Sequence, residues 1–195
     1  MSSQDTGTRI RILEATVRLL ESQGGPGVRM GDIARAAGIS RQAVYLHFTS
    51  RAALLEATTR YLDEKLGLEQ RLARSRAAGS GAERLDAYIE FWGDYIPRIY
   101  AVARALLVAR ETDAAAAAAW NDRMEAMRDG CHAAIQAVKS DGNLSAGWTV
   151  REATDYLWTL LSVRNWEQLT QVCGWSGRKY IKSMKRSARR LFIGG

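Results

Sequence analysis

Residues 32–48 read DIARAAGISRQAVYLHF. This stretch meets the requirements of two short helices joined by a tight turn. Ala34 supplies the small residue needed where two such helices cross, and Gly38 tolerates the positive φ that the turn requires. Ser40 can cap the start of the second helix with its hydroxyl group. The stretch therefore predicts a helix-turn-helix.

The second helix of this pair has an apolar inner face and an outer face that is open to a partner. Val44 and Phe48 stand four residues apart, so they share the inner face. The positions left at the helix start or on the outer face, where a recognition helix meets the major groove, are Arg41, Gln42, Ala43, Leu46 and His47. Arginine can bind guanine bidentately and glutamine can bind adenine, while alanine and leucine can touch a thymine methyl. A plain helical hairpin with a solvated outer face is the simpler alternative, because glycine turns between short helices are common.

The composition is that of an ordinary globular chain. Of its 195 residues, 47% are hydrophobic and 25% are charged, which argues against disorder. Cys131 and Cys173 cannot form a disulfide framework, so we expect a reduced, cytoplasmic protein. No apolar stretch approaches the ~18 residues of a membrane span, and Met1 to Arg9 lack the apolar core of a signal peptide. We therefore expect no membrane partner.

The net charge of +7 is concentrated near the C-terminus. Residues 178–190 contain seven basic residues and no acidic one. The rest of the chain contains 21 basic and 21 acidic residues, so it is neutral. Residues 1–51 contain seven basic and four acidic residues. A nucleic-acid partner fits either end, but charge alone does not choose between them. For residues 178–190, a solvated helix face is the simpler interpretation, and a second acidic or nucleic-acid partner is the alternative.

Helical periodicity dominates the whole chain, and no run shows the alternation of a strand. Gly and Pro breaks and capping residues predict about nine helices. Seven of them are expected at 9–23, 30–37, 41–48, 51–76, 113–139, 149–172 and 176–192. Two more are expected between the break at Gly81 and residue 110: the first ends at residue 95, and the second follows an interruption at Pro97. The chain is therefore expected to be all-α.

Four short motifs follow one another in the first third of the chain: Ile33-Ala34, Gly38-Ile39-Ser40, Val44-Tyr45-Leu46-His47-Phe48 and Ser50-Arg51-Ala52-Ala53-Leu54. Through them, residues 9–55 resemble the N-terminal DNA-binding domain of TetR-family (AcrR-like) transcriptional regulators. The resemblance implies a three-helix DNA-binding head, residues 1–51. It also implies a larger helical body, residues 52–195, that binds a ligand and forms a homodimer.

The resemblance also assigns roles by position. It implies that Tyr45, His47 and Arg51 hold DNA phosphates. Members of the family usually place Thr or Ser before the second helix, whereas this chain has Val28 and Arg29 there. Arg29 can replace the missing hydroxyl contact by charge. The expected DNA-binding residues are therefore Arg29, Ser40, Arg41, Gln42, Ala43, Tyr45, Leu46, His47 and Arg51.

The body is rich in large side chains that suit a small-molecule pocket. The candidate ligand-binding residues are Tyr88, Trp92, Tyr95, Trp120, Met124, Met127, Tyr156 and Trp158. Each one taken singly is more simply a core residue, since a helical bundle needs large side chains. As a set, they favour a small apolar or aromatic effector. The body lacks clustered metal ligands and a Gly-rich phosphate cradle, so we expect no metal and no cofactor.

The last two helices resemble the dimerisation pair of the family, with an expected interface at Leu157, Leu161, Leu169, Ile181 and Met184. The resulting hypothesis is a dimeric, ligand-responsive repressor that binds a palindromic double-stranded DNA operator and is released by its effector. No catalytic residue is assigned, because the sequence holds no CxxC, HExxH or nucleophile elbow. Two alternatives stay open: an architectural helical DNA-binding protein without an effector, and a helical enzyme.

Overall fold

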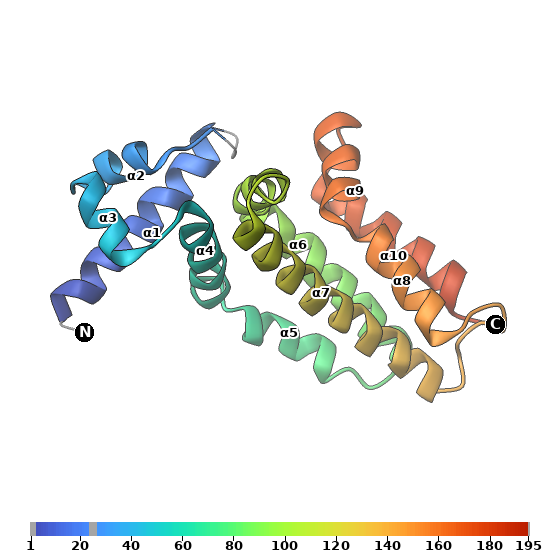
Figure 1. The fold of residues 1–195 in the computed structure, drawn as a ribbon. Helices are drawn as coiled ribbons and strands as arrows, with labels where there is room; N and C mark the ends of the chain where they lie inside the picture. Colours follow the sequence, from blue (N-terminus) through green and yellow to red (C-terminus); the bar gives the residue numbers. More distant parts are fainter. Residues whose placement is uncertain (1–2, 24–26, 195) are drawn as a thin grey trace. The chain divides into compact units, whose positions relative to one another are not determined.

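The computed structural model describes residues 3–23 and 27–194, and the expected break at 24–26 lies outside them (Figure 1). The described residues form ten α-helices and one π-helical turn, so the all-α prediction is confirmed. Among them, only an isolated bridge between Leu144 and Ile193 has β geometry. No described helix is both long and apolar enough to cross a membrane.

The chain divides into two compact units. Unit 1 comprises Met1–Leu66 and Ile99–Asp122, and unit 2 comprises Gly67–Arg98 and Arg123–Gly195. This grouping differs from the expected boundary after residue 51, because the fourth helix packs against the first.

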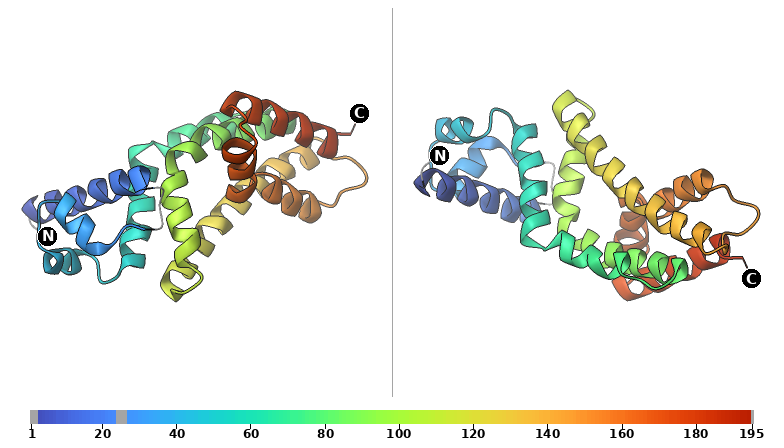
Figure 2. Two further views of the ribbon diagram at one scale, coloured as in Figure 1. Left: turned by 90° about the horizontal axis from the view of Figure 1, so that it is seen from above. Right: turned by 90° about the horizontal axis from the view of Figure 1, so that it is seen from below.

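The first four helices of unit 1 form the head, and the unit also holds the helical segments within Ile99–Asp122. The helices of the head are α1 (Ser3–Gln23), α2 (Met30–Ala36), α3 (Arg41–His47) and α4 (Arg51–Lys65). Helix α1 packs against α2 and α4, and α2 packs against α3, as the two views of Figure 2 show. The fully buried side chains of this core are Ile12, Leu20, Ile33, Val44, Leu54 and Leu55. Burial of this apolar set, rather than the propensity of such short helices, stabilises the head.

The turn between α2 and α3 has the predicted local geometry. Gly38 adopts a φ of +68°, and its N–H donates to the Arg35 carbonyl. The N–H of Ile39 donates to the Ala34 carbonyl at 3.0 Å, which completes a Schellman motif. Ser40 then starts α3 by accepting from the backbone N–H of Ala43 at 3.1 Å. The helix-turn-helix is therefore confirmed.

Two predicted helices are interrupted in the structure. The segment 51–76 is not one helix, because Gly67 adopts a left-handed φ of +65° between α4 and α5 (Leu68–Arg76). The segment 149–172 is also broken, into α8 (Val150–Leu160), α9 (Val163–Glu167) and the π-helical turn η1 (Gln168–Val172). Ser162 separates α8 from α9 by capping the latter.

The predicted interruption at Pro97 is wrong, because α6 runs unbroken from Gly81 to Ala109 with Pro97 inside it. Proline removes one backbone donor, and the Arg98 side chain donates from Nε to the nearby Asp94 carbonyl at 3.3 Å. The border between the two units nevertheless falls between residues 98 and 99, one residue beyond the proline.

Unit 2 is built from α5, the first part of α6, most of α7 (Ala114–Ser140), α8, α9, η1 and α10 (Gly177–Phe192). Its helices approach closely where glycine removes the side chain. A Cβ on Gly81 would lie 2.4 Å from the Val138 backbone nitrogen, and one on Gly130 would lie 2.4 Å from the Tyr88 hydroxyl. The largest fully buried side chains of this unit are Leu85, Ile89, Ile96, Ile135, Tyr180 and Phe192.

Candidate nucleic-acid interface

Helix α3 presents a free outer face. Val44 and Phe48 are buried beneath it, whereas Arg41, Gln42, Tyr45 and Leu46 are exposed. The Leu46 side chain is 84% exposed, which is unusual for leucine. Ala43 and His47 are half-buried. The helix thus offers donors, acceptors and one apolar group together, which is the set that reads base edges in a major groove.

Arg41 and Tyr45 form a pair on this face. The Arg41 guanidinium lies 5.7 Å from the Tyr45 ring centroid, and its Nη2 is 3.5 Å from the Tyr45 hydroxyl oxygen. This contact raises the pKa of Arg41. A hydrogen bond of this length is weak, so the guanidinium is free to exchange the tyrosine for a phosphate or a guanine.

The end of α3 is braced by α1. The Nδ1 atom of His47 lies 3.3 Å from the Asp5 carboxylate, and the His47 carbonyl accepts from Arg9 Nη1 at 3.2 Å. The Arg9 guanidinium also lies 4.3 Å above the Phe48 ring. No local pattern predicts a role for Asp5 or Arg9, because His47 stands about forty residues away from both in the chain. The basic character of Arg9 was the only available signal.

Arg51 has a structural partner in the head. Its Nε donates to the Val28 carbonyl at 3.1 Å, which ties the start of α4 to the segment before α2. Partial burial lowers the pKa of Arg51, and the Asp113 carboxylate opposes that shift. A phosphate contact by this half-buried residue stays a prediction.

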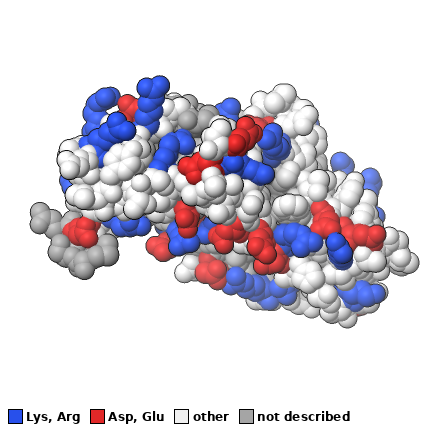
Figure 3. Space-filling view, in the orientation of Figure 1, with Lys and Arg blue, Asp and Glu red and all other residues white. Residues whose placement is uncertain are grey.

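Basic side chains gather over α2 and α3 in Figure 3. The exposed arginines of α1 to α3 and the segments between them are Arg11, Arg18, Arg29, Arg35 and Arg41. Arg29 is the N-cap residue of α2, where no hydroxyl caps the helix, and its backbone N–H donates to the Asp32 carboxylate at 3.3 Å. Its side chain is therefore not used for capping and points to solvent, as a phosphate contact requires.

The candidate effector residues fall into three groups. Tyr88, Trp92, Tyr95 and Met127 are buried in unit 2, and Met124 there is half-buried. Trp120 belongs to unit 1, where the Arg110 guanidinium lies 5.8 Å from its ring. Tyr156 is 48% exposed and packs against Trp148, and Trp158 is half-buried. Tyr156 is therefore a surface residue of unit 2.

The buried group of unit 2 contains polar atoms whose hydrogen bonds are incomplete. The Tyr88 hydroxyl donates to the Met127 carbonyl at 2.9 Å. The Trp92 indole N–H and the Tyr180 hydroxyl are both buried without a hydrogen bond of good geometry, and burial raises the pKa of Tyr180. Burial also raises the pKa of the neighbouring Cys131 thiol to about 12. Tyr180 and Cys131 were missed as members of this group, because they come from other helices.

Three of the expected dimer residues belong to the core of a single chain. Leu157 and Leu161 have no exposed surface, and Met184 is buried. A side chain without exposed surface cannot contact a second subunit, so these residues stabilise the body itself. Leu169 and Ile181 keep some exposed surface, and Val172, on the same apolar stripe as Leu169, is 77% exposed.

Comparison with known proteins places the head in a family. Residues 12–58 match the sequence profile described as bacterial regulatory proteins, tetR family. The nucleoid occlusion factor SlmA of Marinomonas sp. (strain MWYL1) is 33% identical over 66 residues, 34% of each chain. The HTH-type transcriptional regulator BetI of Rhizobium meliloti (strain 1021) is 37% identical over 81 residues, 42% of this chain and 39% of that protein. The chain therefore matches only about a third of the length of these curated relatives.

Solved structures match over nearly the whole chain. A transcriptional regulator from Saccharomonospora viridis, in complex with choline, has a TM-score of 0.81 at 20% identity, over 97% of this chain and all of that one. A TetR-family regulator from Rhodococcus sp. has a TM-score of 0.71 at 19% identity, over 95% and 98% of the two chains. At such identities the likeness concerns the fold alone. Residues 12–58, which hold the helix-turn-helix, match the tetR family of bacterial regulatory proteins, and the chain as a whole has the fold of solved regulators of that family.

Proposed function

We propose that this chain is a cytoplasmic, ligand-responsive repressor that binds a two-fold symmetric DNA operator as a homodimer and is released by a small effector. The exposed outer face of α3 carries this proposal, since a free face with Arg41, Gln42 and Leu46 has no role in the fold of the head. Relatives named as transcriptional regulators support the regulatory role.

The proposed interface divides into base contacts and phosphate contacts. Arg41 reads guanine, Gln42 reads adenine, and Ala43 and Leu46 meet thymine methyl groups. The residues assigned to phosphates are Arg29, Ser40, Tyr45, His47 and Arg51. These contacts set the register of the helix, and the base contacts set the sequence.

The proposed effector site includes the buried group around Trp92. Its aromatic surface suits an apolar or aromatic molecule, and the unsatisfied indole N–H can donate to an acceptor on the ligand. Aromatic faces also attract quaternary ammonium ions, and a structure of similar fold holds choline. A ligand screen should therefore contain both neutral aromatics and quaternary ammonium compounds.

The proposed subunit interface uses the exposed apolar surface near the end of η1. Leu169, Val172 and Ile181 supply it, and a two-fold axis would bring the same surface of a second copy against it. Two heads held in this way read half-sites about one helical turn apart, or a multiple of it.

The decisive experiment selects bound sequences from random duplexes with the full chain. We expect a palindrome, and Gln42→Ala should relax base choice at one position of each half-site by ~1–3 kcal/mol. Gln70→Ala, an exposed glutamine in α5, serves as the matched control and should leave the selected sequence unchanged. Recovery of sequences without two-fold symmetry would overturn the dimeric operator.

A DNA-binding protein without an effector is the second candidate, because relatives described as the nucleoid occlusion factor SlmA are 33% identical to about a third of this chain. Thermal-shift screening separates the two. A ligand present at 100 times its Kd should stabilise the protein by about 2.7 kcal/mol and reduce operator affinity. Stabilisation without any change in operator affinity would favour the second candidate.

A further inference from the structure

Helix α10 has one buried side and one strongly basic side. Tyr180, Met184, Ala188 and Phe192 follow one another at four-residue spacing and are buried in unit 2. The seven basic residues of the helix are Arg178, Lys179, Lys182, Lys185, Arg186, Arg189 and Arg190. With 3.6 residues per turn, they all fall within an arc of about 140° that faces away from the buried side.

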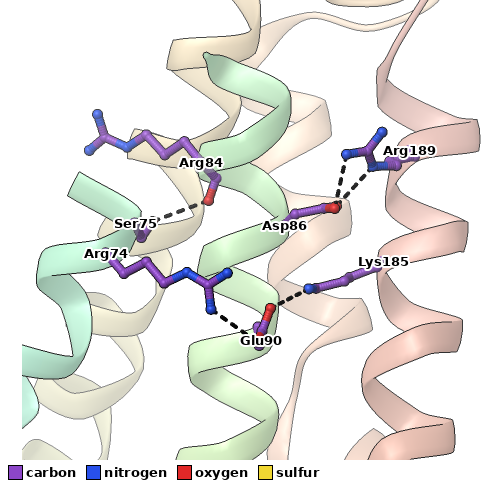
Figure 4. Close-up of polar contacts among 7 residues, drawn as sticks. All are labelled: Arg74, Ser75, Arg84, Asp86, Glu90, Lys185 and Arg189. Carbon is purple, nitrogen blue, oxygen red and sulfur yellow. Dashed lines mark hydrogen bonds and ion pairs between the residues drawn. The ribbon is translucent and has the colours of Figure 1, made fainter. Parts of the chain in front are cut away.

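Two of these cations are used inside the fold. Figure 4 shows Lys185 and Arg189 reaching from α10 to the acidic side chains of α6. Lys185 Nζ lies 2.5 Å from the Glu90 carboxylate, which also accepts from Arg74 of α5, and Arg189 binds Asp86 bidentately at 2.9–3.0 Å. These pairs attach α10 to α6.

The other five cations, which we name the basic arc, are Arg178, Lys179, Lys182, Arg186 and Arg190. All five are exposed, and among the described residues none makes an ion pair with an acidic side chain. Lys179 instead lies over the Trp175 ring at 4.4 Å. Four of them stand at four-residue spacing, where like charges repel one another and destabilise a helix. An anionic partner would relieve this repulsion.

The chemistry of the basic arc favours a polyanion over other partners. A membrane-bound amphipathic helix needs a free apolar face, but the apolar face of α10 is buried in unit 2. Protein interfaces depend on aromatic or apolar anchors at their centre, and the arc itself holds only Lys and Arg. Single-stranded nucleic acids are held by stacked aromatic side chains, and the Trp175 ring beside the arc is already covered by Lys179. A row of long cationic side chains, each about 6 Å further along the helix axis, suits the phosphates of a duplex.

We propose that the basic arc is a second, sequence-independent contact surface for the phosphate backbone of duplex DNA. This surface acts separately from α3: it carries no base-reading side chain of the recognition helix and adds affinity for every sequence alike. Its binding should therefore depend steeply on salt and weakly on sequence.

The test measures binding of the full chain to a duplex without operator sequence, by fluorescence anisotropy between 50 and 200 mM salt. The arc variant is R178Q/K182Q/R186Q. The matched control is K139Q/R151Q/R164Q, which removes three exposed cations of unit 2 outside the arc. If all three arc residues contact phosphates, the slope of log K against log salt should become shallower by about 2.7 in the arc variant alone. Equal changes in both triple variants would overturn the proposal, because they would reflect net charge.

Two further arms identify the partner and separate this surface from the head. Arc-dependent binding to polyglutamate, to anionic vesicles or to single-stranded DNA, without arc-dependent binding to the duplex, would also overturn the proposal. The head variant R41Q/Q42A should lose any sequence preference. Adding the arc substitutions to it should still make the salt dependence of binding shallower. Circular dichroism verifies that every variant is folded, so that a shallower salt dependence cannot be caused by unfolding.

Discussion

The guanidinium of Arg9 lies 4.3 Å above the ring of Phe48, so the first helix of the head holds the end of the recognition helix. Arg9 also donates to the His47 carbonyl. Since Phe48 is the C-cap residue of α3, the direction in which α3 points depends on a residue that stands 39 positions earlier in the chain. If α3 binds an operator as proposed, the contribution of Arg9 to that binding can be measured separately from any contact with DNA.

Arg9→Ala should destabilise the head by about 1–2 kcal/mol, since it removes a cation–π contact and one hydrogen bond. Operator affinity should fall with it. Arg11→Ala removes an exposed neighbouring arginine and is the control for charge. Urea denaturation and operator titration measure the two effects. Equal losses in both variants would mean that Arg9 acts only through its charge.

Gly38→Ala should destabilise the protein by about 1–2 kcal/mol, because alanine is strained at a φ of +68°. Gly31→Ala should change the free energy of unfolding in the opposite direction. Gly31 lies inside α2 with open space around it, so alanine there should stabilise the helix by about 0.5–1 kcal/mol. Denaturation midpoints that move in the same direction for both variants would contradict the turn geometry.

Pro97→Ala should restore a backbone donor inside α6 and stabilise the protein by about 1–3 kcal/mol. The border between the two units lies one residue beyond this proline, so we also expect the variant to respond less to the effector. Thermal unfolding measures the first effect, and effector titration against a fixed operator complex measures the second. A more stable protein with an unchanged response would remove Pro97 from the switch.

Leu161→Asp and Leu169→Asp should fail in different ways. Leu161 is fully buried, so an aspartate there costs several kcal/mol and unfolds unit 2. Leu169 is partly exposed, so its aspartate should leave the chain folded and split the dimer. Circular dichroism and analytical ultracentrifugation distinguish the two outcomes. A folded, dimeric Leu169→Asp protein would place the subunit interface elsewhere.

The two cysteines should react with thiol reagents at very different rates. Cys173 is exposed, whereas burial raises the pKa of Cys131 to about 12. At pH 8 we expect one thiol to be modified rapidly and the second only on unfolding. Because the folded state holds the Cys131 proton more tightly than the unfolded state, this group favours folding least at high pH. Below about pH 9 the thiol is protonated in both states, so the free energy of unfolding does not depend on it. As the pH rises from about 9 to 12, only the unfolded state loses this proton, and the free energy of unfolding falls. A Cys131→Ser variant is the control and should flatten that pH dependence.

Features that depend on short-range contacts follow directly from the order of the amino acids. The turn at Gly38 and the caps at Ser40, Ser50 and Asp113 each involve residues within five positions of one another. Such hydrogen bonds follow from residue type and local spacing, so the helix-turn-helix and the starts of the helices could be predicted. The sequence also placed the basic run in one helix.

What covers each helix face depends on how the whole chain packs. Periodicity marks Leu157 and Leu161 as apolar, but it does not tell whether their own chain or a second copy buries them, and the structure assigns them to their own chain. It likewise decided that Glu90 pairs with Lys185, 95 residues away, while the basic arc of α10 is left without acidic partners. An apolar side chain and a cation each have many suitable partners, and only the packed fold brings one of them into contact.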